Sequence, residues 1–192
     1  MASSAQEDGS NGLRVIDLGC GPNKVPGAYG VDRHAYQGVD QVVDLDQPPW
    51  PLPSDTFDRL YARHVIEHVA DIGAFMREVH RIARDGAIVQ IITPHFSSLN
   101  SWEDPTHRWH LSAKWYATFT ERYMADQMPA FEHISTEIQF ARRSLRGILS
   151  RLMIRLRGQA WWEKHYAFIL RGRNIVTELR VRKKPNGVGH PG

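Results

Sequence analysis

The segment Val15–Asn23 constrains the fold more than any other part of the chain, because two glycines directly follow a short apolar run. Such a run is typical of a β-strand that ends in a tight turn, since glycine permits positive φ angles and a close approach of backbone to ligand. A second short strand, Gly30-Val31-Asp32, ends in a carboxylate. A carboxylate at that place can accept hydrogen bonds from both ribose hydroxyls. The pattern predicts a site for an adenosine-bearing cofactor.

The spacing distinguishes two such cofactors. A dinucleotide site requires a third glycine that opens a helix facing a pyrophosphate, with an acidic residue about 20 positions further on. Here Pro22-Asn23-Lys24 follow Gly21, and Asp32 comes much sooner than that. Asp17 precedes the turn, where it would repel a pyrophosphate and attract a sulfonium or an amino group. S-adenosylmethionine therefore fits this segment better than NAD.

Further motifs follow in a fixed order, and with Val15–Pro22 they cover residues 13 to 95, about half of the chain: Gly30-Val31-Asp32, Val43-Asp44-Leu45, Pro51-Leu52-Pro53, Phe57-Asp58, His64-Val65-Ile66-Glu67-His68-Val69 and Gly86-Ala87-Ile88-Val89-Gln90-Ile91-Ile92-Thr93-Pro94. This series resembles class I S-adenosylmethionine-dependent methyltransferases of the small, ubiquinone-methyltransferase-like kind. The resemblance implies a Rossmann-like α/β fold with an open, mainly parallel twisted sheet. It also implies S-adenosylmethionine as the cofactor and methyl transfer as the activity.

The resemblance further implies which residues hold the cofactor: Asp17, Gly19 and Gly21 the methionine part, Asp32 the ribose, Asp44 and Leu45 the adenine, and His64 the region of the sulfonium. Two interpretations apply to Arg63. Its guanidinium could bind a carboxylate or phosphate of the substrate bidentately, or it could pair with Glu67 across one helical turn. His64 and His68, four positions apart, could chelate a metal on one helix face, but for His68 we favour a buried, hydrogen-bonded side chain.

The periodicity of the chain predicts five strands and a helix before residue 95: strands at Leu13–Leu18, Ala28–Asp32, Gln41–Leu45, Arg59–Ala62 and Ala87–Thr93, and a helix at Ile72–Ala83 that ends at Asp85-Gly86. The strand Ala87–Thr93 is apolar throughout, as expected for a parallel strand buried on both faces. Residues 22–30 are too few for a normal crossover helix. We therefore expect the first crossover to be a turn, so that this version of the fold has a shortened first crossover.

The segment 95–112 has no regular periodicity and directly follows the fifth strand, at the sheet edge where ligands bind. We expect it to be a substrate-side loop that covers the cofactor region. Its polar and aromatic residues suit four chemistries: a divalent metal bound by His95, His107, His110 and Asp104, a metal-free general base at His107 or His95, tryptophans that box an aromatic substrate, or tryptophans that shield the sulfonium. Alternatively, Asp104–His107 forms an Asx-type turn before a helix that begins at Ser112.

We assign the residues of this site as follows: His107, His95 and His64 as catalytic, Arg63, Trp102, Asp104 and His110 as substrate-binding, and no metal. The expected acceptor is a small or medium-sized molecule that offers an O, N or C nucleophile. The alternatives are a methyltransferase acting on RNA or protein, and a regulatory protein that binds S-adenosylmethionine without catalysis.

We expect two more strands, at Phe131–Phe140 and Asn174–Lys183, and an insertion at 141–170 lies between them. Arginines and apolar residues alternate at helical spacing in Ala141–Gly158, which predicts a basic amphipathic helix. It could pack on the domain with solvated arginines, or contact an anionic substrate or lipid surface. Nucleic acid is the least favoured partner, because no RNA-binding module accompanies the helix. The aromatic group Trp161, Trp162, Tyr166 and Phe168 suits a core or a homodimer contact.

The composition indicates one domain, since the chain has 192 residues, of which 42% are hydrophobic. We place it at 13–184, between disordered tails at 1–12 and 185–192. The single cysteine, Cys20, excludes an internal disulfide and a multi-cysteine zinc site. The first residues lack the apolar core of a signal peptide, and no run is long enough to span a membrane. We therefore expect a cytoplasmic protein.

Overall fold

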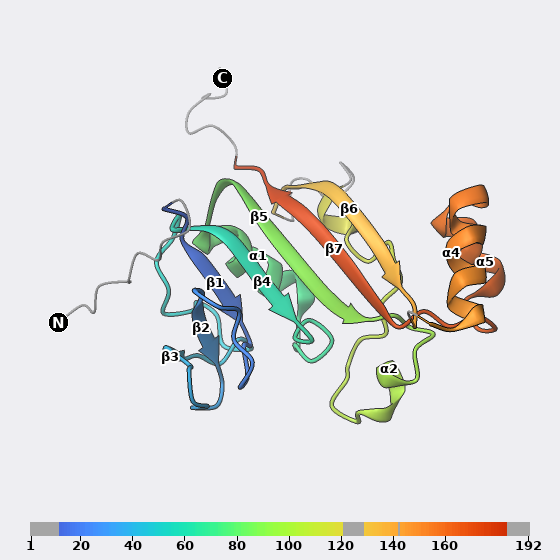
Figure 1. The fold of residues 1–192 in the computed structure, drawn as a ribbon. Helices are drawn as coiled ribbons and strands as arrows, with labels where there is room; N and C mark the ends of the chain where they lie inside the picture. The colour runs from blue at the N-terminus through green and yellow to red at the C-terminus, as the bar shows by residue number, and fades with distance from the viewer. Residues whose placement is uncertain (1–11, 121–128, 142, 184–192) are drawn as a thin grey trace, which may run out of the picture.

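Seven strands form one sheet in the order β3-β2-β1-β4-β5-β7-β6 (Figure 1). The computed structural model describes residues 12–120, 129–141 and 143–183, so nearly all of the two predicted tails lies outside the described residues. Strands β1 to β5 are parallel, and β7 runs antiparallel to both β5 and β6. The bounds are β1 Val15–Leu18, β2 Tyr29–Asp32, β3 Gln41–Val42, β4 Phe57–Arg63, β5 Ala83–Pro94, β6 Phe131–Gln139 and β7 Asn174–Val181. The prediction of a mainly parallel, Rossmann-like sheet is confirmed.

The crossovers between the first four strands contain no helix. Turns and bends occupy residues 19–28 between β1 and β2, as the short spacing predicts, and irregular segments also connect β2 to β3 and β3 to β4. The first helix is α1 (Ile72–Ile82), which follows β4 and begins at an N-cap where the Asp71 carboxylate accepts the amide of Ala74. The helix ends at Ile82, one residue before the predicted end, and β5 starts at once at Ala83, so Asp85-Gly86 lies within this strand.

Strands β5 and β7 are fully buried on one face of the sheet only. Phe75, Met76 and Val79 of α1 pack into the main core, and in Figure 1 this helix lies behind the sheet while no helix of the described residues covers the front. In β5 the buried Val89 and Ile91 accordingly alternate with half-buried neighbours. The expectation that this strand is buried on both faces is wrong, because the helix-free crossovers leave the second face without a cover.

The insertion between β6 and β7 forms two helices at the far end of the sheet from β3, α4 (Leu145–Arg157) and α5 (Gln159–Tyr166) (Figure 1). Trp162 of α5 is fully buried in a second core with Ile138 and Phe140, which confirms a core role for this tryptophan. Phe168, in contrast, is 77% exposed. Two further short helices, α2 (Asn100–Glu103) and α3 (Ala117–Thr120), lie between β5 and β6.

Helix α4 turns its apolar stripe away from the domain. Its buried residues are Gly147 and Ser150, whereas the apolar residues that define the stripe are exposed: Leu145 84%, Ile148 53%, Leu149 47%, Leu152 52% and Leu156 71%. The interpretation of α4 as a helix that packs its apolar side on the domain is therefore wrong. Among the described residues, no helix is both long and apolar enough to cross a membrane.

Candidate functional site

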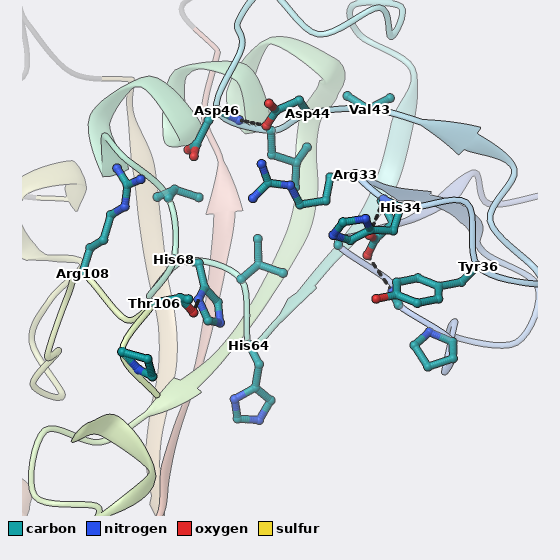
Figure 2. A pocket seen from close by; sticks show the side chains of 18 residues that line it. Arg33, His34, Tyr36, Val43, Asp44, Asp46, His64, His68, Thr106 and Arg108 are labelled. Atoms are coloured by element: carbon teal, nitrogen blue, oxygen red, sulfur yellow. Dashed lines mark hydrogen bonds between the residues drawn. The ribbon is translucent and has the colours of Figure 1, made fainter. Parts of the chain in front are cut away.

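A cavity of about 700 Å³ opens at the carboxyl ends of the parallel strands. Such a position is usual for ligands of open α/β sheets. Figure 2 shows His68, Thr106 and Arg108 on one side and Arg33, His34 and Tyr36 on the other. The lining residues are Gly19, Gly21, Pro22, Asp32, Arg33, His34, Tyr36, Val43, Asp44, Leu45, Asp46, His64, Val65, His68, Val69, Pro105, Thr106 and Arg108.

The glycine turn after β1 forms one wall of this cavity. Gly19 and Gly21 have positive φ angles of 64° and 53°, a conformation that favours glycine. A Cβ at Gly19 would also overlap Cγ2 of Val65. Both glycines therefore keep the turn open as a cradle that a side chain would fill, as the sequence predicts.

Asp32 is the last residue of β2 and lies at the cavity wall, only 8% exposed. Its two carboxylate oxygens accept the amides of Gly21 and His34, each at 2.9 Å. These bonds fix the orientation of the carboxylate and leave further lone pairs for a ligand. Asp44 and Leu45 also line the cavity, after the end of β3. Gly19, Gly21, Asp32, Asp44, Leu45 and His64 therefore share one cavity.

Asp17 and Arg63 pair with each other below the turn. Nη2 of Arg63 donates to Oδ2 of the fully buried Asp17 at 2.7 Å and to the carbonyl oxygen of Asn23. Neither interpretation of Arg63 anticipates this pair, since Glu67 instead lies 3.2 Å from Nδ1 of His64. Oδ1 of Asp17 and Nε of Arg63 are buried without a hydrogen-bond partner among the described residues. Neither residue is among those that line the cavity, so the contact of Asp17 with the methionine part stays a prediction.

His64 follows β4 in a left-handed conformation, with a φ of 57°. Few residues other than glycine adopt this conformation, and such strain concentrates at functional sites. The side chain of His64 is 49% exposed and lines the cavity, while its Nδ1 faces Oε1 of Glu67 at 3.2 Å. A carboxylate at Nδ1 orients an imidazole whose Nε2 can then act as a base.

The segment 95–112 lies against the turn after β4. The amide of Arg108 donates to the carbonyl of Glu67, and the indole of Trp109 donates to the carbonyl of Val69, both at 2.8 Å. The Asx-type turn is present, since Oδ1 of Asp104 accepts the Thr106 amide at 2.8 Å. The helix expected to begin at Ser112 is absent, because α3 begins only at residue 117.

The five predicted site residues of this segment, His95, Trp102, Asp104, His107 and His110, do not line the cavity. His95 is fully buried, and its two ring nitrogens bond Ser97 and Glu163, so it is not placed to act as a base. Trp102 and His110 stack on each other at 3.5 Å. Asp104 caps its own turn, and the hydrogen bonds from Thr106 lower the pKa of its carboxyl. The proposed set of His95, His107, His110 and Asp104 is therefore not one metal site.

Burial raises the pKa of the Cys20 thiol, and the carboxylates of Asp17 and Asp32 raise it further. Cys20 therefore remains a protonated thiol beside the cradle, which fits a filler and not a nucleophile.

Several cavity residues were not assigned from the sequence: Arg33, His34 and Tyr36 after β2, and Pro105, Thr106 and Arg108 in the loop. The sequence does contain a signal for Arg33, His34 and Tyr36. They directly follow a strand that ends in Asp32, and ligands bind at such ends. No periodicity marks the loop residues, because their position depends on docking against the turn at 64–69.

The fold and the glycine-acidic cavity define a class I S-adenosylmethionine-dependent methyltransferase. The chain matches the family described as methyltransferase domain over residues 3–149, and it belongs to that family. The family and the fold indicate S-adenosylmethionine as the cofactor, and the residues of the cavity fit it.

Relatives and solved structures agree with this assignment. A ubiquinone biosynthesis O-methyltransferase of Rhodopseudomonas palustris (strain HaA2) is 29% identical over 102 residues, which are 43% of this chain and 40% of that protein. A malonyl-[acyl-carrier protein] O-methyltransferase of Yersinia pestis is 27% identical over 150 residues, 70% of this chain and 52% of the relative. The chain thus spans about half the length of these relatives or less. An S-adenosylmethionine dependent methyltransferase from Mesorhizobium loti shares the fold, with a TM-score of 0.58 and 17% identity over 88% of this chain and 90% of that one.

Proposed function

We propose that this protein transfers a methyl group from S-adenosylmethionine to a nucleophilic atom of a small or medium-sized acceptor. One observation carries the proposal: a single cavity combines the glycine turn and Asp32 with a second group of polar residues, His64, His68 and Thr106. The first group suits an adenosyl cofactor, and the second group provides a base and hydrogen-bonding groups for an acceptor. An oxygen nucleophile is favoured, because both curated relatives described above are named O-methyltransferases.

The residues of the chain have distinct roles in this proposal. Asp32 accepts the ribose hydroxyls, Asp44 and Leu45 flank the adenine, and the Asp17–Arg63 pair meets the charged groups of the methionine part. S-adenosylmethionine supplies an activated methyl group on its sulfonium. His64 removes the proton of the acceptor through Nε2, and Glu67 at Nδ1 stabilises the imidazolium that forms. The loop at 105–108 excludes water and aligns the acceptor.

A screen of small acceptors tests this proposal, with formation of S-adenosylhomocysteine as the readout. Turnover that requires a small hydroxyl compound supports it. Turnover only with RNA or protein, with a steep loss at high salt for RNA, would identify a macromolecular methyltransferase. Tight binding of S-adenosylhomocysteine with no turnover on any acceptor would identify a binding protein.

We further propose that α4 contacts an anionic lipid surface. On an ideal helix with 3.6 residues per turn, the exposed apolar stripe points away from the buried Gly147 and Ser150, and the arginines at 146, 151 and 155 fall on its two flanks. A helix that lies in a membrane interface has this arrangement. Each buried leucine contributes about 1.5–3 kcal/mol and each basic residue near an anionic surface about 1 kcal/mol. A contact between two copies through the same stripe is less suitable, because it would bring the arginines of both helices together.

Sedimentation with vesicles tests the lipid contact. Wild-type protein is expected to bind vesicles that contain phosphatidylglycerol and not vesicles of phosphatidylcholine alone. The pair of substitutions Leu149→Glu and Leu152→Glu should abolish binding, whereas Ile134→Glu, at an exposed apolar position of β6, should not. Concentration-dependent dimers without vesicle binding would show that the stripe is a contact between two copies.

A further inference from the structure

Glu67, His68 and His107 form a cluster that the proposed methyl transfer does not fully use. Each places one potential ligand atom within 4.8 Å of the other two. Glu67 and His68 belong to the turn after β4, and His107 belongs to the loop that docks on it. The cluster therefore joins the two segments that border the acceptor side of the cavity.

The hydrogen bonds of the two histidines determine where their lone pairs lie. Nδ1 of His107 lies 3.1 Å from the carbonyl oxygen of Ser101, which can only accept, so this nitrogen carries the proton. The hydroxyl of Thr106 donates to Oδ1 of Asp104 at 2.6 Å, and Nδ1 of His68 lies 3.0 Å from that hydroxyl oxygen. His68 must therefore donate to Thr106. With the proton of each ring on Nδ1, Nε2 keeps its lone pair, and Nε2 of His107 lies 3.9 Å from Oδ2 of Asp104.

The third member supplies a buried negative charge. The Glu67 side chain is 1% exposed, and its Oε2 has no hydrogen-bond partner among the described residues. A buried carboxylate oxygen without a donor is costly. Two imidazole nitrogens and a carboxylate oxygen within 4.8 Å of one another are a ligand set that suits a cation.

We infer that Glu67, His68 and His107 bind a divalent transition-metal ion at the wall of the cavity, which departs from the assignment of no metal made from the sequence. Two imidazoles and one carboxylate suit Zn²⁺, Mn²⁺ or Fe²⁺ and leave coordination positions open. The bonds from Nδ1 to Ser101 and to Thr106–Asp104 are the outer contacts that orient ligating histidines. Because His68 lines the cavity, an open position would face the acceptor. There the ion would polarise an acceptor hydroxyl, a role that rests on the proposed function, whereas binding of the ion does not.

Metal titration of the whole chain tests the inference without cofactor or acceptor. Chelator-treated protein is titrated with Zn²⁺ by calorimetry and with Co²⁺ by visible absorption, which reports the coordination directly. One equivalent is expected to bind. His107→Ala and Glu67→Gln should each weaken binding more than 100-fold, above the range of about 10–100-fold that outer contacts contribute. Thr106→Val, which removes only the support of His68, should fall within that range.

His110→Ala is the matched control, because His110 lies on the same loop but bonds Ser101 and stacks on Trp102. It should bind metal like the wild type. If Glu67→Gln does not fold, His107→Ala and Thr106→Val decide the outcome. Absence of a one-to-one complex in the wild type, or equal weakening by His110→Ala and His107→Ala, would overturn the inference. Either result would leave S-adenosylhomocysteine binding and methyl transfer to be judged on their own assays.

Discussion

The guanidinium of Arg63 lies 2.7 Å from Oδ2 of Asp17, and this pair connects the ends of β4 and β1 below the glycine turn. Asp17 is fully buried, whereas the Arg63 side chain is 33% exposed. The amide of Val25 also donates to Oδ2 of Asp17, at 2.8 Å. One carboxylate thus holds both adjacent strands and the crossover loop in the geometry of the cofactor cavity.

Removal of Arg63 should destabilise the protein, because it leaves the buried Asp17 carboxylate without its cation. We expect Arg63→Ala to lower the free energy of unfolding by about 3 kcal/mol, the low end for a buried pair. Arg59→Ala is the matched control on the same strand, since Arg59 pairs with the partly exposed Glu178 and should cost about 1 kcal/mol or less. Urea unfolding measures both. Equal losses in the two variants would show that burial of Asp17 is irrelevant.

Asp32→Ala should weaken the binding of S-adenosylhomocysteine by about 1.5–3 kcal/mol, the range for hydrogen bonds to charged groups. Calorimetry with S-adenosylhomocysteine and with NAD measures the change. Asp40→Ala serves as the control, because Asp40 also accepts a backbone amide, that of Gly30, but does not line the cavity. If Asp32→Ala binds like the wild type, the ribose assignment fails, and preferential binding of NAD would refute the cofactor itself.

The cofactor side of the cavity could be predicted from the sequence because its determinants are local. Gly19, Gly21 and Asp32 follow directly from strand ends and turn chemistry, and the missing first crossover helix follows from chain length alone. The acceptor side depends on long-range docking. Glu67 meets His107 only because the loop after β5 packs on the turn after β4, and no sequence periodicity encodes that contact.

Sequence-based predictions were wrong where the same residue pattern occurs in two different environments. His95 sits in a loop rich in polar groups, but it closes a buried contact with Glu163 of the insertion. The stripe of α4 has the periodicity of a packed helix, yet periodicity alone does not state which side faces the domain. The small residues Gly147 and Ser150, which allow close packing, lie on its buried side together with the partly buried Met153 and Ile154.

His64 is expected to be the base, and its replacement should separate catalysis from cofactor binding. His64→Gln should reduce kcat by about 10²–10⁴-fold, with the affinity for S-adenosylhomocysteine changed by no more than a few fold. Trp102→Ala is the comparison, because Trp102 is 60% exposed and lies outside the cavity. Its kcat/KM should remain near the wild-type value. A strong loss in Trp102→Ala would instead mean that this tryptophan reaches the acceptor during turnover.

Glu163 of α5 bonds His95 and the amide of Ala113, and this contact should make the stability of the protein depend on pH in the acidic range. Burial alone would raise the pKa of this carboxyl, but hydrogen bonds from His95 and from the amide of Ala113 outweigh it, so the net pKa is lowered. A lowered pKa in the folded state stabilises the protein above the unfolded value of about 4.3. This contribution is lost as the pH falls through the folded pKa.

Glu163→Gln removes the charge with little change in shape and tests this linkage. At pH 7 the variant should be less stable than the wild type by about 1.5–3 kcal/mol, the cost of losing hydrogen bonds to a charged group. The difference in stability between the two proteins should shrink below pH 4.3, where the wild-type carboxyl becomes protonated and therefore uncharged, like the glutamine of the variant. Thermal unfolding of both proteins across this pH range measures the difference. A gap that stays constant from pH 7 to pH 3 would show that Glu163 acts through packing and not through its charge.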